Sequence, residues 1–189
     1  MTPAETPAEL ELLALADPFS AVRQAQSTCI VRSPVERPEW RETLLRILRP
    51  WWENASVREM AEWLDRWAAY EPRDSARPRL RWYIRLGCLV AKCMVLRTET
   101  AAELARIEAW AFGEERHHAF ARPETWEPVY QSEDDVLPSD GAIQYLGQAI
   151  WHPKRCGQLE EFFWEANEAT GMDFAPLIRA AIPLETLVP

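Results

Sequence analysis

Glycine is scarce in this chain, with only six in 189 residues. A loop that cradles phosphate needs closely spaced glycines, because its backbone must approach the anion without Cβ atoms in the way. The chain has no Gly-x-Gly-x-x-Gly, no Gly-Lys-Ser/Thr and no Gly-x-Ser-x-Gly sequence. These absences argue against nucleotide chemistry.

Histidine and cysteine, which supply many metal ligands and reactive groups, are also few. The chain has three histidines and four cysteines, and no His-Glu-x-x-His sequence that would indicate a zinc site. The cysteines are too irregularly spaced for a disulfide scaffold, so we expect reduced, buried thiols. Cys88 and Cys93 lie five residues apart and would face different sides of a helix. We interpret both as small apolar core residues.

Long apolar runs are absent as well. The most apolar stretch, 86–96, is interrupted by Lys92 and lies between Arg85 and Arg97, so it is shorter than the roughly 18 apolar residues that cross a bilayer. The first 15 residues carry three glutamates and lack the basic and then apolar order of a secretory signal. We therefore expect a soluble, cytoplasmic protein that does not bind membranes.

Lysine is the rarest charged residue, since only Lys92 and Lys154 occur among 21 basic residues. Arginine and alanine are plentiful instead, as a GC-rich coding bias would produce, and we infer a bacterial source. The abundance of Ala, Leu, Glu and Arg, with few β-branched residues, favours an all-α fold in which 15 prolines separate short helices. The length suits a single domain over residues 1–189.

Helix positions follow from capping residues and from apolar periodicity. Ser56 with Glu59, and Thr100 with Glu103, form capping-box patterns that mark the beginnings of two helices. The stretch 80–96 is apolar nearly all round, which is typical of a central helix. We predict a helical bundle or short stack of about eight helices around it. The other helices are expected over residues 8–16, 18–31, 40–51, 57–70, 100–113, 140–151, 156–170 and 174–181.

Three single residues are predicted to define helix ends. Asp17 is placed to cap the helix that begins at Pro18. Pro50 should bend or end the helix over 40–51. Gly171 follows the last residue of the helix over 156–170, where a left-handed conformation is common.

Tryptophan is abundant, with ten residues. It serves equally well as core filler and as an anchor at a binding surface. Trp51 and Trp52 are neighbours, about 100° apart on a helix, so both cannot easily point inward. Trp126 and Trp151 are candidates for exposure. Five others occupy apolar positions of helical patterns and are predicted to be core: Trp40, Trp63, Trp67, Trp82 and Trp110.

Charge is unevenly distributed along the chain. The net charge is −3 over residues 1–70, with 8 basic and 11 acidic residues, and +5 over residues 71–97, with 7 and 2. It is −11 over residues 98–189, with 6 and 17. The acidic part should repel nucleic acid and attract basic protein surfaces. Alternatively, the basic central segment lies against acidic helices and is neutralised within the molecule.

A long Pro-containing acidic loop is predicted over residues 122–139. An exposed tryptophan bordered by carboxylates would be a recognition site for a protein that presents arginine or lysine. We therefore predict a non-enzymatic protein-binding module, with no catalytic residue, metal or cofactor, that occludes a basic partner protein. The predicted partner-binding residues are Trp126, Glu133, Asp134, Asp135 and Trp151.

Three other functions are open. A metal-dependent enzyme would use the overlapping Glu-x-x-His sequences formed by Glu114, Glu115, His117 and His118, although the second such sequence of a di-iron site is missing. A thiol enzyme would use Cys156, whose neighbours His152, Lys154 and Arg155 favour the thiolate. A homo-oligomeric structural subunit with a self-complementary tryptophan-rich surface is a third possibility.

In size and charge the chain resembles the small acidic helical immunity proteins that neutralise bacterial toxins. The helix at 82–93, the Ala109-Trp110-Ala111 stretch and the Pro-containing loop before Gly141 also resemble helical accessory proteins of type VI secretion clusters. This second resemblance covers about half the chain and carries over no functional residue. Both resemblances imply an immunity protein, an adaptor or an effector chaperone.

Overall fold

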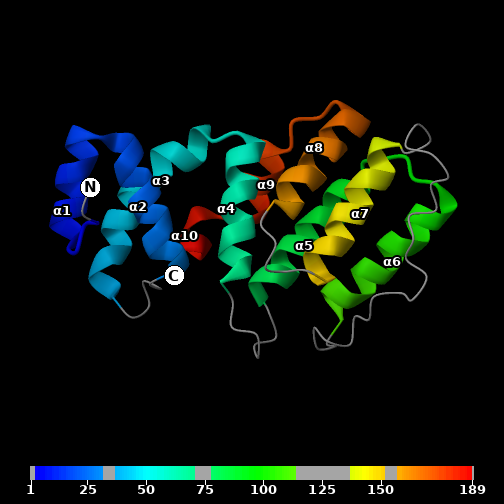
Figure 1. The fold of residues 1–189 in the computed structure, drawn as a ribbon, viewed down its shortest axis with the longest axis horizontal. Helices are drawn as coiled ribbons and strands as arrows, with labels where there is room; N and C mark the ends of the chain where they lie inside the picture. Colours follow the sequence, from blue (N-terminus) through cyan, green and yellow to red (C-terminus); the bar gives the residue numbers. More distant parts are fainter. Residues whose placement is uncertain (1–2, 32–36, 71–77, 114–136, 152–156, 189) are drawn as a thin grey trace. The chain divides into compact units, whose positions relative to one another are not determined.

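The computed structural model describes residues 3–31, 37–70, 78–113, 137–151 and 157–188 (Figure 1). Ten α-helices and one short 3-10 helix lie within these ranges, and no strand does, which confirms the predicted all-α fold. Contacts group the chain into two compact units: unit 1, residues 1–63 with 175–189, and unit 2, residues 64–174. The single-domain organisation stays a prediction.

Unit 1 is built on α3, which packs against α1, α2 and α10. Arg179 also ties α9 to the C-terminal end of α3, because its Nε donates to the carbonyl of Trp52 at 2.9 Å and another guanidinium nitrogen donates to that of Ala55 at 2.6 Å. The bounds are α1 (Pro7–Ala16), α2 (Pro18–Val31), η2 (Pro38–Trp40), α3 (Arg41–Asn54), α9 (Ala175–Ala181) and α10 (Leu184–Leu187), with α4 (Val57–Ala69) crossing the division between the units.

The predicted helix starts at Asp17 and Ser56 are confirmed. The Asp17 carboxylate accepts the amide of Ser20 at 3.1 Å, and the hydroxyl and amide of Ser20 hold the pKa of Asp17 below its usual value. At α4 the Glu59 carboxylate accepts the amide of Ser56 at 2.8 Å, while the Ser56 hydroxyl accepts the amide of Glu59 at 3.3 Å. Pro50 does not end its helix, since α3 continues to Asn54.

Replacing Ser56 with alanine should lower the free energy of unfolding by about 1 kcal/mol, because the first turn of α4 loses its capping hydroxyl. Urea denaturation followed by circular dichroism measures the change. Ser56→Asp keeps a capping oxygen and should stay close to the wild-type value. Equal stability of the alanine variant and the wild type would show that the capping box contributes nothing.

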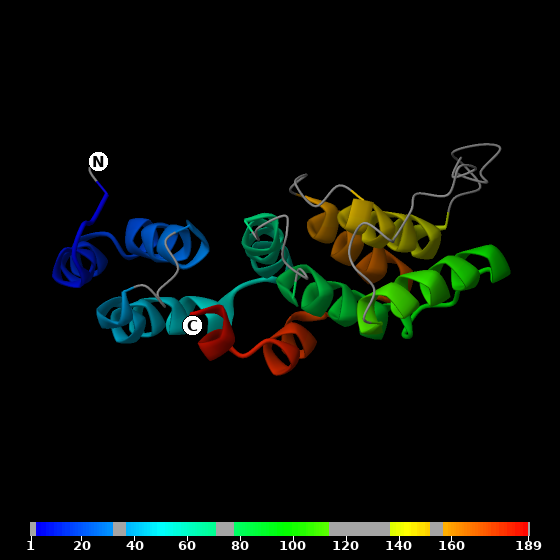
Figure 2. The same cartoon turned by 90° about the horizontal axis from the view of Figure 1, so that it is seen from below.

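Unit 2 contains α5 (Pro78–Ala91), α6 (Thr98–Phe112), α7 (Pro138–Trp151) and α8 (Gln158–Thr170), as well as the last residues of α4. The predicted central helix is α5, which packs against α6, α7 and α8 (Figures 1 and 2). Most of its residues are buried. It approaches α7 closely at Gly87, where a Cβ would lie 2.4 Å from Cδ1 of Leu146. The helix is shorter than the predicted 80–96, because turns follow Ala91.

Two other expectations in unit 2 are wrong. Thr100 does not cap α6, because this helix already begins at Thr98. The hydroxyl of Thr100 donates instead to the buried carboxylate of Asp140. Cys93 is exposed beyond the end of α5, whereas Cys88 is buried as predicted.

Gly171 does end α8 in the left-handed conformation, with φ of 67°. None of the described helices is long and apolar enough to span a membrane.

Candidate protein-binding surface

The predicted site residues fall outside the part of the chain that the structure describes. This holds for Trp126, Glu133, Asp134 and Asp135, while Trp151 closes α7 but its side chain is not described. The residues of the two enzymatic alternatives lie outside it too: Glu114, Glu115, His117, His118, His152, Lys154, Arg155 and Cys156. All of these assignments stay predictions, and the surface that the structure does describe consists of other residues.

Most of the described tryptophans belong to the core. Trp40, Trp63, Trp67 and Trp110 are buried, as predicted, and Trp82 is half-buried. Trp51 and Trp52 differ as their adjacency requires, because Trp52 is buried while Trp51 is half-buried. Both rings pack against Trp63, with centroids 5.9 Å and 5.4 Å from it.

Trp164 on α8 is different, since 61% of it is exposed. The inner side of α8 carries Leu159, Phe162, Phe163 and Ala166, which are all buried. Trp164 projects from the opposite side because two residues beyond Phe162 correspond to about 200° of helix rotation. Trp164 is not among the predicted site residues, although the same apolar periodicity places it away from the core.

Carboxylates surround Trp164 on the outer side of α8. Glu161, Glu165 and Glu168 follow one another at successive turns of the helix, so their charges are close neighbours. Glu165 is half-buried, and burial together with the charges of Glu161 and Glu168 raises its pKa. Tyr145 of α7 adjoins them, since burial and the charges of Glu161 and Glu165 raise its pKa also.

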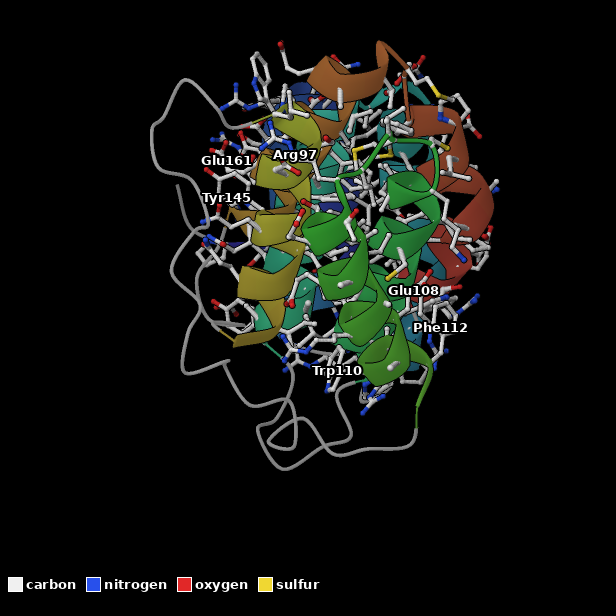
Figure 3. All side chains as sticks on the ribbon, turned by 90° about the vertical axis from the view of Figure 1, so that its right-hand side faces the viewer. Arg97, Glu108, Trp110, Phe112, Tyr145 and Glu161 are labelled. Carbon is white, nitrogen blue, oxygen red and sulfur yellow. The ribbon has the colours of Figure 1, made fainter. Side chains whose placement is uncertain are left out.

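We call Tyr145, Glu161, Trp164, Glu165 and Glu168 the acidic face. Figure 3 shows Tyr145 and Glu161 close together on one side of unit 2, with Glu108 and Phe112 on the other side. The absence of a side chain at Gly141 makes room for Glu165, because a Cβ on Gly141 would lie 3.2 Å from the Glu165 carboxyl carbon. The face thus depends on the packing of α8 against α7.

The three glutamates of the acidic face make no ion pair with any arginine or lysine that the structure describes. Arginines of the basic central segment have other contacts. Arg81 donates to the carbonyls of Trp110 and Gly113, and Arg85 to the carbonyl of Ala111. These carbonyls form the negative end of the α6 dipole. Part of the basic charge is therefore offset at a helix C-terminus.

The position of α8 depends on a buried carboxylate from α4. The oxygens of Asp65 accept the Tyr83 hydroxyl at 2.6 Å, the amide of Gly157 at 3.0 Å and the amide of Leu159 at 3.1 Å. Gly157, with φ of 100°, supplies no capping side chain of its own, so Asp65 caps α8 from a distance. Burial raises the pKa of Asp65 to about 6, although these donors oppose the shift. Asp65 is a positioning residue for the acidic face.

Among the residues that the structure describes, no group of three or more His, Cys, Asp or Glu side chains could hold a metal ion. The side chains of Cys29 and Cys88 are buried, and burial raises the pKa of the Cys88 thiol to about 12. Comparison with protein families, curated proteins and solved structures found no match to the chain.

Proposed function

We propose that this chain is a non-enzymatic, cytoplasmic protein-binding module of bacterial origin, of the immunity, adaptor or effector-chaperone type. Its partner is a protein with a basic surface, which docks on the acidic face. The observation that carries the proposal is Trp164, a large apolar side chain left exposed among three carboxylates. Tryptophan is one of the residue types that are enriched in the hot spots of protein interfaces.

The electrostatics of the acidic face favour a cationic partner. Burial raises the pKa of Glu165, and so do the charges of Glu161 and Glu168, which repel its carboxylate. An arginine placed over the Trp164 ring would gain a cation–π interaction and would offset this repulsion. A cation stabilises the ionised form of Glu165, so binding should weaken as the pH falls and this carboxylate becomes protonated. The preformed helices would cover the basic surface of the partner and so occlude it sterically.

Charge reversal on the acidic face should slow association with the partner. The partner is first recovered by co-purification from the native host. The association and dissociation rates of the two purified proteins are then measured. The double variant Glu161→Lys/Glu168→Lys should reduce the association rate about tenfold and flatten its dependence on salt. A matched control, Glu42→Lys/Glu53→Lys, makes the same change of charge on exposed residues of α3 and should bind like the wild type.

Trp164→Ala tests the anchor separately from the charge. It should raise the dissociation rate about thirtyfold, with little effect on association, because hot-spot contacts form after the encounter. Binding by both α8 variants with wild-type kinetics would contradict the proposal. Asp134→Lys/Asp135→Lys tests the predicted loop in the same assay, and unchanged kinetics would exclude the loop from the interface. Stoichiometric metal that is lost in His117→Ala would favour the enzymatic alternative instead.

A further inference from the structure

Arginine side chains lie over aromatic rings at four places within the described residues. In each pair the guanidinium carbon is between 4.4 and 5.1 Å from the ring centre. The face of an aromatic ring carries partial negative charge and attracts a cation placed over it. The pairs are Arg23 with Phe19, Arg79 with Trp67, Arg81 with Trp110 and Arg85 with Phe112.

Each of these guanidinium groups also donates a hydrogen bond to an oxygen beside the ring. The acceptor belongs to the aromatic residue itself or to its neighbour in sequence. The acceptors are the Ser20 hydroxyl for Arg23 and the carbonyls of Trp67, Trp110 and Ala111 for Arg79, Arg81 and Arg85. An aromatic ring with an oxygen acceptor next to it is therefore the setting in which this chain holds an arginine.

Trp164 of the acidic face offers the same setting on the outside of the molecule. Its side chain is 61% exposed, and no arginine of the described ranges lies over its ring. Glu161 precedes it by three residues and Glu168 follows it by four, so a carboxylate lies one helical turn away on either side. The ring and its oxygen acceptors are thus present, while the arginine is not supplied by the described part of the chain.

We infer that the partner protein presents an arginine, rather than a lysine, to Trp164, with the guanidinium stacked on the ring and donating to Glu161 and Glu168. The inference rests on the proposed function, because it names the partner side chain that the acidic face selects. A guanidinium is planar and carries five donors around its edge, so it stacks and donates in the same geometry. The ammonium of lysine is compact and strongly hydrated, and it has no flat face to stack.

Titration of the full chain with two peptides of equal charge tests the inference. The probes are dye-labelled hexa-arginine and hexa-lysine, and fluorescence anisotropy measures their dissociation constants. Hexa-arginine should bind about fivefold more tightly, because only this peptide gains the stacking contact. Fluorine NMR of the protein labelled with 5-fluorotryptophan locates the contact. The Trp164 signal, identified by its absence in Trp164→Phe, should shift when unlabelled hexa-arginine is added.

Two leucine variants assign the preference to the ring. Trp164→Leu keeps an apolar side chain and all the carboxylates but removes the aromatic face, so it should bind the two peptides equally. The matched control is Phe112→Leu, at an aromatic side chain of α6 that is 56% exposed but already lies under Arg85. This control should keep the fivefold preference. Circular dichroism should show equal helix content in both variants and the wild type.

Three results would each overturn the inference. They are equal affinity of the wild type for the two peptides, a preference that persists in Trp164→Leu, and a Trp164 signal that hexa-arginine leaves unmoved. None of them bears on the proposed function, which is tested separately by the binding kinetics of the recovered partner with the charge-reversal variant of α8. Failure of the arginine preference and failure of the acidic face as an interface are therefore distinguishable.

Discussion

Replacing Asp65 with alanine is expected to lower the free energy of unfolding by about 3 kcal/mol at neutral pH, since three buried or part-buried donors lose their acceptor. These donors are the Tyr83 hydroxyl and the amides of Gly157 and Leu159. Because the amides lie at the start of α8, the change should also loosen this helix. At neutral pH, Asp65→Asn retains an acceptor oxygen and should stay within about 1 kcal/mol of the wild type.

The same carboxyl gives the wild type a predictable dependence on pH. Its pKa is 3.8 in the unfolded chain and about 6 in the folded protein, so the folded state binds more protons between these values. Stability therefore decreases as the pH rises from about 4 to about 6, by up to about 3 kcal/mol. Asp65→Asn has no proton to exchange and should not show this contribution.

Urea denaturation at a series of pH values measures both effects. The destabilisation in Asp65→Ala should be larger at low pH, where the protonated wild type is most stable. The difference in stability between the wild type and Asp65→Asn should follow one titration between the two pKa values. A difference that does not change with pH would contradict the assignment of the buried, proton-binding group to Asp65.

Replacing Arg81 with methionine is expected to lower the free energy of unfolding by about 3 kcal/mol. The buried guanidinium donates to the carbonyls of Trp110 and Gly113, and its central carbon lies 4.6 Å from the centre of the Trp110 ring. Hydrogen bonds from a charged donor contribute about 1.5–3 kcal/mol each, and a desolvated cation–π contact about 2 kcal/mol. Methionine fills part of the space but leaves the carbonyls at the end of α6 without this donor.

Arg85→Met is the matched control for this variant. Arg85 also donates to a carbonyl of α6, that of Ala111, and lies over the Phe112 ring, but it is only half-buried. Its replacement should cost about 1 kcal/mol, because water can replace the lost donor. Denaturation followed by tryptophan fluorescence compares the two variants. Equal losses would show that burial of the Arg81 charge has no special effect.

These two residues bear on the proposed function in different ways. Asp65 caps the helix that presents Trp164, so Asp65→Ala should weaken partner binding as well as folding. Arg81 donates to carbonyls at the C-terminus of α6, a helix that contributes no residue to the acidic face, so Arg81→Met should bind normally wherever it is folded. Binding assays below the unfolding transition therefore separate positioning of the acidic face from general stability.

Local patterns predicted much of the secondary structure. The caps at Asp17 and Ser56 and the glycine end at Gly171 involve partners within a few residues, so the sequence alone contains them. Thr100 shows the limit of such patterns. Its hydroxyl had the correct spacing to Glu103 for a capping box, but Asp140, forty residues away along the chain, accepts its hydrogen bond instead.

The sequence by itself determined the all-α fold, the apolar character of the helix at 78–91 and the acidic C-terminal part, because composition and helical periodicity are local properties. Only the tertiary structure decided which of the described carboxylates lack a cationic partner and how the start of α8 is capped. These features depend on pairs far apart in sequence, such as Asp65 and Leu159, which are 94 residues apart. No periodicity encodes such a distance, since it arises only when the helices pack.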